Sequence, residues 1–384
     1  MTYDVLVAGA SFAGLAVAQR VRGRVLLVDR SPLGAHQTSA CGAPASLLRA
    51  LGAEEAILQV HRRIVVHTPR NTSVWPLGGE PFCTFDYRLF CQLALRRARG
   101  VEFVQASVQG VEGATVHTSA GPFRARLLAD CTGWRAALLR AVGSDFRRGR
   151  WLGFGLETEV PGTLPEGLHF FLPGIIPDGY GWAFPCGKRV RLGVLSYRGR
   201  TRLRETLDEF AHRFGVEPQG YHGGYLGFGV HDPVVGSVFG VGDAVGQCLP
   251  LTGEGIRSAV HAGWLVGQLF QRILEGRCTV EWARERYRAY VAAQRRRVGF
   301  LALATWAVLH LPARAVELAV RAFSWPPLRH RFMKEYLSTF GPSLPSGILE
   351  GGAGVAEQAD AADSNSAGPQ RPCGFDSRPR HQGG

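Results

Sequence analysis

One stretch near the N-terminus, residues 3–29, constrains the fold of this chain more than any other part of the sequence. Its apolar run Val5–Ala8 is typical of a strand that is buried on both faces. Gly9 then permits a tight turn, and Gly14 lets the following helix pack closely against the strand. Asp29 stands 20 residues after Gly9, at the end of the next apolar run, where an acid accepts a hydrogen bond from an adenosine ribose. The stretch therefore predicts a βαβ unit that binds a dinucleotide, with the pyrophosphate at the helix N-terminus.

The glycine pattern departs from G-x-G-x-x-G at its middle position, which is Ser11. A side chain there crowds the approach of the backbone to a pyrophosphate. We still include Ser11 among the predicted cofactor-binding residues, together with Arg30, which directly follows the acid.

The composition indicates a globular chain with room for two packed domains. The chain has 384 residues, of which 46% are hydrophobic and 20% charged, and its mean hydropathy of −0.01 does not suggest many membrane spans. The net charge of +13 comes almost wholly from arginine, because Lys188 and Lys334 are the only lysines. A basic surplus suits anionic lipid surfaces or acidic substrates. No nucleic-acid partner is predicted, since no basic stretch has interleaved aromatic residues.

The eight cysteines are scattered without a C-x-x-C pair, so no zinc or other metal site is predicted. Reduced thiols in the cytoplasm are the simplest interpretation. We expect no signal peptide, because the first strand begins about three residues into the chain without a charged segment before it.

The pattern of short strands changes at about Trp151. From there the strands are rich in aromatic residues, glycine and proline, which favours an antiparallel sheet over residues 151–232. A buried strand returns at Val238–Val241, so residues 1–150 and 233–278 are predicted to form one discontinuous domain around that sheet. Residues 279–345 are predicted to be helical.

Two later segments raise questions about membranes and about the chain end. In residues 295–312, three arginines precede an apolar run of about 14 residues, short of the roughly 20 needed to span a bilayer. A core or interdomain helix and an interfacial helix both stay open. Residues 346–384 contain too few large apolar groups to fold alone, and we expect a disordered tail. The tail also resembles the conceptual peptide produced when a reading frame runs on through a neighbouring tRNA gene, so it takes no part in the functional argument.

Three separated segments now align: GASFAG with its acid, LLADCTGWR, and GVGDAVGQCLPLTGEGIRSAVHAG. Together they resemble the FAD-binding domain shared by aromatic hydroxylases and the geranylgeranyl reductase family. The resemblance implies an α/β fold in which a Rossmann-like FAD-binding domain is interleaved with an antiparallel-sheet substrate domain of α+β type, followed by a helical C-terminal region. The cofactor it implies is FAD.

The resemblance also implies roles for individual residues. Asp243 is expected on the ribityl hydroxyls, and the rest of its GD…P…GEG pattern beside the isoalloxazine comprises Pro250, Gly253, Glu254 and Gly255. Asp130 and Gly133 match the family's GADG segment, written ADCTG here. Arg88 matches the arginine that approaches the pyrophosphate, although its spacing to the next leucine differs; a surface helix arginine is the alternative.

Two features point toward the reductases within that group. Cys41 and Gly42 match a Cys-Gly pair on a loop that faces the flavin, although a small buried hydrophobe is the alternative for Cys41. The segment PDGYGWAFP resembles the family's YxWxFP signature. Its Tyr180, Trp182 and Phe184 alternate along one strand and so form an aromatic wall, which suits an isoprenoid chain or a flat polycycle. Plain core packing is the alternative for these side chains.

The first functional hypothesis is an FAD-dependent oxidoreductase that reduces carbon–carbon double bonds of a polyprenyl or similar hydrophobic substrate, with Cys41 or a water as the proton donor. An aromatic or polyketide monooxygenase is the alternative, and a non-redox flavoprotein of lycopene-cyclase type is a third. A halogenase is disfavoured because no lysine precedes Lys188. The electron donor stays open between NAD(P)H and ferredoxin, as do peripheral membrane contact and the oligomeric state.

Overall fold

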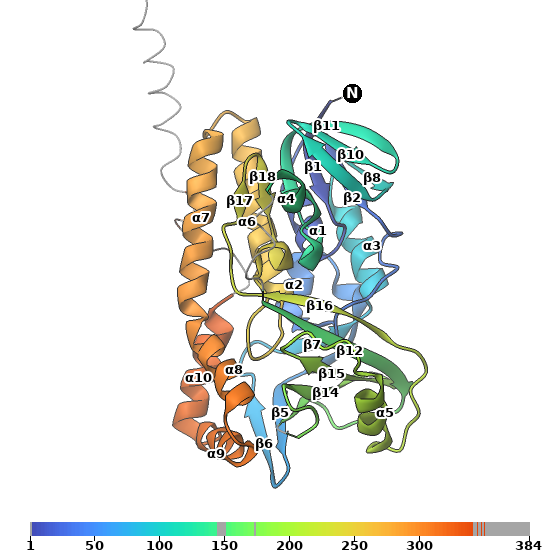
Figure 1. Ribbon diagram of the computed structural model, residues 1–384, viewed down its shortest axis with the longest axis vertical. Helices are drawn as coiled ribbons and strands as arrows, with labels where there is room; N and C mark the ends of the chain where they lie inside the picture. The colour runs from blue at the N-terminus through green and yellow to red at the C-terminus, as the bar shows by residue number, and fades with distance from the viewer. Residues whose placement is uncertain are drawn as a thin grey trace, which may run out of the picture.

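The computed structural model describes residues 2–143, 151–172, 174–340, 344, 347 and 349. The strands of these residues form three sheets, and long helices flank them on one side of the molecule (Figure 1). The expected tail at 346–384 lies outside the described residues, apart from 347 and 349.

An eight-stranded sheet forms the upper half of the molecule in Figure 1. Its main path is β17 (Val234–Val235), β18 (Val238–Gly240), β11 (Gly121–Asp130), β1 (Thr2–Ala8), β2 (Val25–Asp29) and β8 (Val101–Gln105), and β9 (Val108–Glu112) and β10 (Thr115–Thr118) extend from β11. From β18 to β8 the strands run parallel. β8 pairs in parallel with β2, a direction that its half-buried alternation in the sequence does not reveal.

Helices cover both faces of this sheet. α1 (Phe12–Ala18), α3 (Tyr87–Arg97) and α6 (Ile256–Leu274) lie on one face, and α4 (Ala137–Val142) lies on the other. α2 (Ala45–Ala50) packs against β3 and β4 instead, and the short helices η1 (Glu54–Ala56), η2 (Gly133–Arg135) and η4 (Gly242–Val245) lie in the connections. α1 packs tightly on α6: a Cβ added at Gly263 would lie 2.6 Å from the Ala13 carbonyl oxygen. The late segment 238–274 is therefore an integral part of the first sheet and its helical cover.

A seven-stranded sheet forms the lower half. Its order is β16 (His222–Phe228), β12 (Trp151–Pro161), β15 (Arg189–Ser196), β14 (Gly179–Cys186), β13 (Leu168–Phe171), β5 (Arg63–Thr68) and β6 (Asn71–Pro76). All neighbours are antiparallel except β13 and β5. β5 and β6 lie within the range 1–150 that was assigned to the first domain, yet they pair in this sheet. The domain boundaries stay a prediction.

The two faces of the seven-stranded sheet have different covers. α5 (Arg204–His212) packs on one face through Leu207 and Phe210. The other face packs against α8 (Gly299–His310) and α10 (Pro326–Ser338), where Leu301 and Met333 share a buried cluster with sheet residues. α7 (Val280–Arg297) and α9 (Ala313–Phe323) complete the C-terminal helices. None of the helices in the described ranges is long and apolar enough to cross a membrane.

A three-stranded sheet connects the two larger ones. It consists of β3 (Gly42–Pro44), β7 (Phe82–Phe85) and β4 (Ile57–His61). His61 fixes this sheet to β14, since its ring hydrogen-bonds the Pro185 carbonyl oxygen at 3.2 Å. The predicted α/β architecture, a Rossmann-like sheet with an interleaved, mainly antiparallel sheet and a helical C-terminal region, is confirmed.

Candidate functional site

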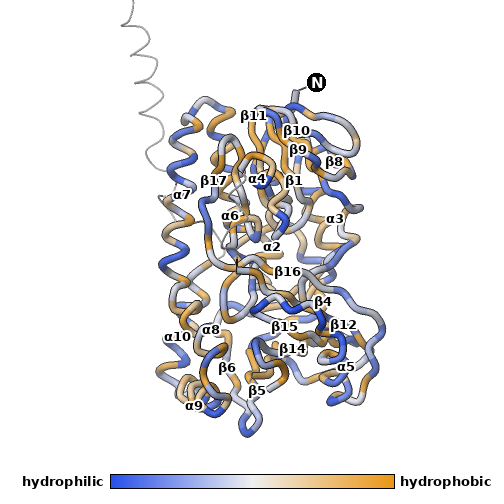
Figure 2. The backbone as a smooth tube through the Cα atoms, viewed as in Figure 1, coloured by the Kyte–Doolittle hydropathy of each residue, from blue (hydrophilic) through white to orange (hydrophobic). Residues whose placement is uncertain are grey.

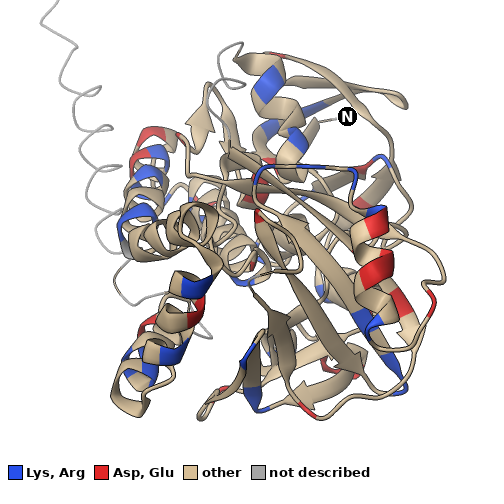
Figure 3. Cartoon of the chain, turned by 60° about the horizontal axis from the view of Figure 1, so that its bottom comes forward, with Lys and Arg blue, Asp and Glu red and all other residues tan. Residues whose placement is uncertain are grey.

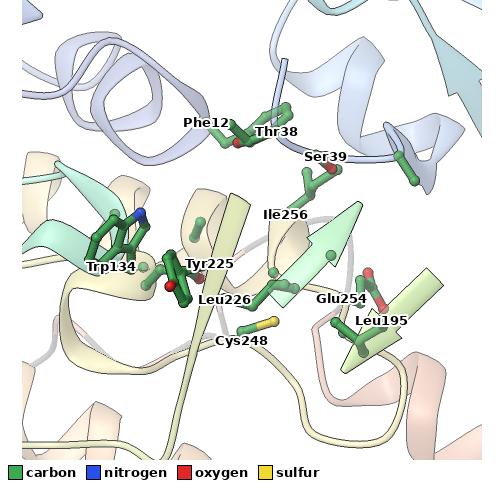
Figure 4. Close-up of a pocket in the computed structure, with 18 of the residues that line it drawn as sticks. Phe12, Thr38, Ser39, Trp134, Leu195, Tyr225, Leu226, Cys248, Glu254 and Ile256 are labelled. Carbon is green, nitrogen blue, oxygen red and sulfur yellow. The ribbon is translucent and has the colours of Figure 1, made fainter. Parts of the chain in front are cut away.

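A cavity of about 1200 Å³ lies between the two large sheets. Pockets for one drug-sized ligand usually have about 300–1,000 Å³, so this cavity has room for more than one molecule. Twelve of the predicted site residues line it: Gly9, Ser11, Asp29, Arg30, Gly133, Asp243, Gly253, Glu254, Gly255, Tyr180, Trp182 and Phe184. Figure 4 shows part of it, with Thr38 and Ser39 on one side and Leu195 and Glu254 on another. The structure therefore brings the cofactor motifs and the aromatic motif together.

The glycine cradle, which we define as Gly9 to Phe12, occupies one end of the cavity. Gly9 has a φ of +103°, and a Cβ there would lie 2.2 Å from the Cys131 carbonyl oxygen. A Cβ at Gly14, which does not line the cavity, would lie 1.8 Å from the Gly9 carbonyl oxygen. Asp29 holds the turn by accepting a hydrogen bond from the Ala10 amide at 2.8 Å. Backbone contacts therefore shape the cradle and leave no room for side chains at these glycines.

Tyr87 accounts for the departure from the glycine pattern. Its hydroxyl donates a hydrogen bond to Ser11 Oγ at 2.9 Å, and its ring lines the cavity. Asp86 positions Tyr87 by capping the N-terminus of α3, where it accepts from the Leu89 amide. Sequence reasoning missed Tyr87, because the two partners of this hydrogen bond lie 76 residues apart.

Two further cofactor predictions do not line the cavity. Asp130 is buried beneath the loop that carries Gly133, where it accepts hydrogen bonds from the Thr132 amide and hydroxyl and from the Leu139 amide. Burial raises the pKa of the Asp130 carboxyl above its ordinary range. Arg88 is exposed at the start of α3. In this structure Asp130 supports the shape of the loop, and Arg88 is placed outside the cavity.

The 243–257 segment forms the opposite side of the cradle. Asp243 accepts a hydrogen bond from the Gly227 amide at 3.3 Å. Gly255 is the N-cap of α6, and no side chain caps that helix, so the free amides of its first turn are suited to an anion. Pro250 precedes this turn without lining the cavity.

A buried charge group stands beside this turn. Glu254 accepts from the Arg257 guanidinium at 2.7 Å and from the Tyr336 hydroxyl. Arg257 also donates to the Phe340 carbonyl oxygen just beyond α10. Burial and the neighbouring carboxylate raise the pKa of the Tyr336 phenol above its ordinary range. The group ties the cavity wall at Glu254 to the C-terminal helices.

The structure does not bring the Cys41 thiol to the cavity. Thr38, Ser39, Ala40 and Gly42 line it, but Cys41 does not. A φ of +52° turns the Cys41 side chain into the core, where it is 0% exposed and its Sγ donates to the Ser39 carbonyl oxygen at 3.4 Å. Burial raises the pKa of this thiol well above its ordinary value. The interpretation of Cys41 as a small buried residue fits this placement better than the predicted role as proton donor.

The aromatic wall, which we define as Tyr180, Trp182 and Phe184, lies on the cavity face of β14. The three side chains are 6–8% exposed, so they both pack in the core and line the cavity. The Tyr180 hydroxyl donates to the Thr252 carbonyl oxygen at 2.5 Å, which joins the wall to the cofactor side. Beyond the wall the lining stays apolar, with Leu168, Phe170, Ile64, Val66 and Trp75.

Strand register extends the Trp182 position across the whole sheet. In one row lie His222, Glu157, Gly193, Trp182, Phe170 and Val66. The row is charged at the β16 end and apolar at the β5 end. Sequence reasoning missed Glu157 and His222, which both line the cavity. The signal that could have found Glu157 is a pair of carboxylates, Glu157 and Glu159, on one alternation of β12, which places two acids on the same face of a largely buried strand.

The far end of the cavity opens between C-terminal helices. α8 contributes Leu303, Ala307 and Val308, and α9 contributes Val316, Val320 and Phe323. α8 buries Leu301 and Thr305 and exposes Leu303 (67%), so one face of the helix belongs to the core and another reaches the surface. An apolar path therefore runs from the aromatic wall to the molecular surface.

This fold and this site define an oxidoreductase with a Rossmann-type FAD-binding architecture. No protein-family profile matches the chain. It is 28% identical over 309 residues to digeranylgeranylglycerophospholipid reductase 1 of Methanothermobacter thermautotrophicus. The matched region covers 69% of this chain and 76% of that protein. The resemblance to the geranylgeranyl reductase family is therefore confirmed, and the chain is an enzyme similar to these reductases.

Solved structures share the fold at lower identity. A geranylgeranyl bacteriochlorophyll reductase-like protein from Thermoplasma acidophilum has a TM-score of 0.75 at 18% identity and covers 87% of this chain and 99% of its own. A probable FAD-dependent monooxygenase from Pseudomonas aeruginosa has a TM-score of 0.62 at 16% identity and covers 88% of this chain and 100% of its own. Reductases and monooxygenases thus share this architecture, and the fold alone does not separate the two reactions.

Proposed function

We propose that the chain binds FAD along the glycine cradle and reduces carbon–carbon double bonds of a polyprenyl lipid in the adjoining apolar channel. The observation that carries the proposal is the single cavity, which joins a dinucleotide cradle to an aromatic wall and opens between α8 and α9. Long isoprenoid chains need such a continuous apolar path, whereas a small aromatic substrate does not.

The residues present fit FAD. The cradle backbone at Gly9 and the uncapped start of α6 offer amides to a pyrophosphate, and Asp29 and Asp243 offer carboxylates to hydroxyl groups. Ser11 fits as well, because Tyr87 holds its hydroxyl.

Reduced flavin would supply a hydride equivalent to the double bond. The chain itself contributes position and water exclusion. Tyr180, Trp182 and Phe184 form a flat surface on which an unsaturated chain can lie, and their burial keeps bulk water out. The monooxygenase alternative uses the same cradle, so it must be separated by experiment. The described cavity lining contains no lysine, and Lys188 lies on the turn after β14.

We further propose that the mouth of the channel touches a lipid surface. Exposed apolar side chains gather around it: Leu303 (67%), Trp306 (53%), Leu318 (64%) and Trp325 (60%). Figure 2 shows mixed apolar and polar colouring on α8 and α9, and Figure 3 shows Lys and Arg recurring along the C-terminal helices. Such a surface suits peripheral binding to an anionic bilayer, from which a lipid could enter the channel directly. A cytoplasmic location stays a prediction.

The test begins with the visible spectrum of the purified protein, which should show bound flavin. The flavin is then photoreduced without oxygen and mixed with a detergent-dispersed digeranylgeranyl glycerophospholipid. Reoxidation with a product heavier by two hydrogens per double bond supports the proposal. The monooxygenase would be established instead by two observations together. The reduced flavin would not be reoxidised by this lipid or by geranylgeranyl diphosphate, and an aromatic compound would stimulate oxygen-dependent consumption of NAD(P)H. NADPH and reduced ferredoxin are compared as donors in the same assay.

A further inference from the structure

A buried carboxylate and a histidine meet at the lining of the cavity. Glu157 on β12 and His222 on β16 face each other directly in the strand register. Glu157 Oε1 accepts from His222 Nε2 at 2.8 Å, and the two side chains are 4% and 30% exposed. One partner is therefore hidden, while the other has an edge open to the cavity.

Glu157 also contacts the aromatic wall. Its Oε2 accepts a hydrogen bond from Trp182 Nε1 at 2.7 Å, and the Gln37 amide donates to Oε1 at 3.4 Å. A neutral acceptor would satisfy one indole N–H, whereas burying a charged carboxylate costs several kcal/mol unless it has a charged partner. The carboxylate at this position thus favours positively charged neighbours: the buried Arg191 guanidinium is one, and His222, in direct hydrogen-bond contact, is placed to be another.

The other protonated groups near the wall are poorly suited to give up a proton. The Tyr180 hydroxyl donates to Thr252, and burial raises its pKa well above the ordinary value. The Cys41 thiol is turned away from the cavity. Among the cavity-lining residues that the structure describes, the only other histidine is His36, which is exposed and has no carboxylate against it.

We propose that His222 is the proton donor for double-bond reduction and that Glu157 is its positioning residue. This inference rests on the proposed function. Reduced flavin would supply a hydride equivalent to one carbon of the double bond, and the π electron pair would take a proton from imidazolium Nδ1 of His222 to form the second C–H bond. His222 is left neutral, with its Nε2–H still donated to Glu157. Its exposed edge takes up the next proton from water.

The main test uses His222→Gln, with His212→Gln as the matched control, because His212 also pairs with a glutamate but does not line the cavity. Both proteins are loaded with FAD, photoreduced without oxygen and mixed with the digeranylgeranyl lipid. We expect His222→Gln to reoxidise at least about 100-fold more slowly, within the range for loss of a general acid. Flavin content and the extent of photoreduction should be unchanged, and His212→Gln should stay within about twofold of the parent. A parent-like rate in His222→Gln would overturn the proposal.

A positioning role for Glu157 predicts a change in the pH profile. Glu157→Gln removes a charge from beside the His222 ring, so we expect a changed dependence of the rate on pH, whereas a merely structural role would lower the rate equally at every pH. The other titratable groups around the pair, Arg191, Glu159 and Cys41, remain in place in this variant. A slower enzyme with an unshifted profile would assign Glu157 a merely structural role.

A third readout needs neither substrate nor turnover. Trp182 touches Glu157, so its fluorescence should report protonation of the pair. The fluorescence of Trp182 itself is the difference between the parent and Trp182→Phe. This fluorescence should change in a step with pH in the parent, and the step should be absent from His222→Gln. No step in the parent would overturn the proposal even if the substrate assignment failed. Turnover of the lipid with an unaffected His222→Gln would refute the proton donor while leaving the proposed function intact.

Discussion

The two ends of the cavity are built by different means. At the cradle, backbone contacts define the shape, and an added Cβ at Gly9 or Gly14 would overlap a carbonyl oxygen. At the aromatic wall, side chains define the shape, and the backbone beneath is an ordinary antiparallel sheet. The cradle therefore tolerates few substitutions, whereas the wall can change its ligand by exchanging side chains. This difference explains how one fold can hold one cofactor and serve both reductases and monooxygenases.

The largest expected effect comes from Gly9→Ala. A Cβ would lie 2.2 Å from the Cys131 carbonyl oxygen at a φ of +103°, so the turn must move. We expect loss of bound flavin and at least about 3 kcal/mol of destabilisation. Gly113→Ala is the control, because its φ is +57° with nothing within 4 Å, and should cost only about 1 kcal/mol. Flavin absorbance and thermal melting measure both; a variant that keeps its flavin contradicts a cradle built by backbone contact.

The same difference decides what the sequence could predict. Gly9, Gly14 and Asp29 lie within one βαβ unit, so their spacing along the chain reports their spacing in space. Glu157 and His222 meet only through strand pairing across 65 residues, which no local pattern reveals. The loop around Cys41 lines the cavity, but the direction of the Cys41 side chain depends on a φ of +52° that the sequence does not disclose.

Acid should weaken the connection between the two ends. Burial lowers the pKa of His61 from 6.5 to about 4, so the fold favours the neutral ring. As the pH falls below 6.5, His61 becomes protonated in the unfolded chain while the folded chain keeps its ring neutral. The contribution of His61 to the free energy of unfolding is therefore fully present above pH 6.5 and is lost as the pH falls to about 4. The gap corresponds to at most about 3 kcal/mol. Urea denaturation at pH 7 and pH 4.5 measures it: His61→Gln should lose less stability on acidification than the parent, whereas exposed His330→Gln should match the parent.

Trp182→Phe tests whether side chains set the substrate end. The phenyl ring keeps the wall but leaves Glu157 without its indole donor. We expect flavin binding to persist and kcat/KM for the digeranylgeranyl lipid to fall about 30-fold, or about 2 kcal/mol. Trp75→Phe is the matched control on the same face, because Trp75 Nε1 has no hydrogen-bond partner among the described residues. Equal losses in the two variants would mean that ring size, and not the hydrogen bond, matters.

The smallest effect is expected at the mouth of the channel, where side chains meet solvent. Leu318 and Trp325 are 64% and 60% exposed and do not line the cavity, so serine at both positions should change stability by less than about 0.5 kcal/mol. If these side chains enter a bilayer, flotation with anionic vesicles should weaken about fivefold and turnover of vesicle-embedded lipid should fall with it. Turnover of the detergent-dispersed lipid should not change, because neither side chain lines the cavity. Leu58→Ser, an exposed leucine on β4 that does not line the cavity, should leave all three measurements unaltered. Equal losses with vesicles and detergent would instead make these side chains part of the substrate channel, and the side-chain-built end would then extend to the surface.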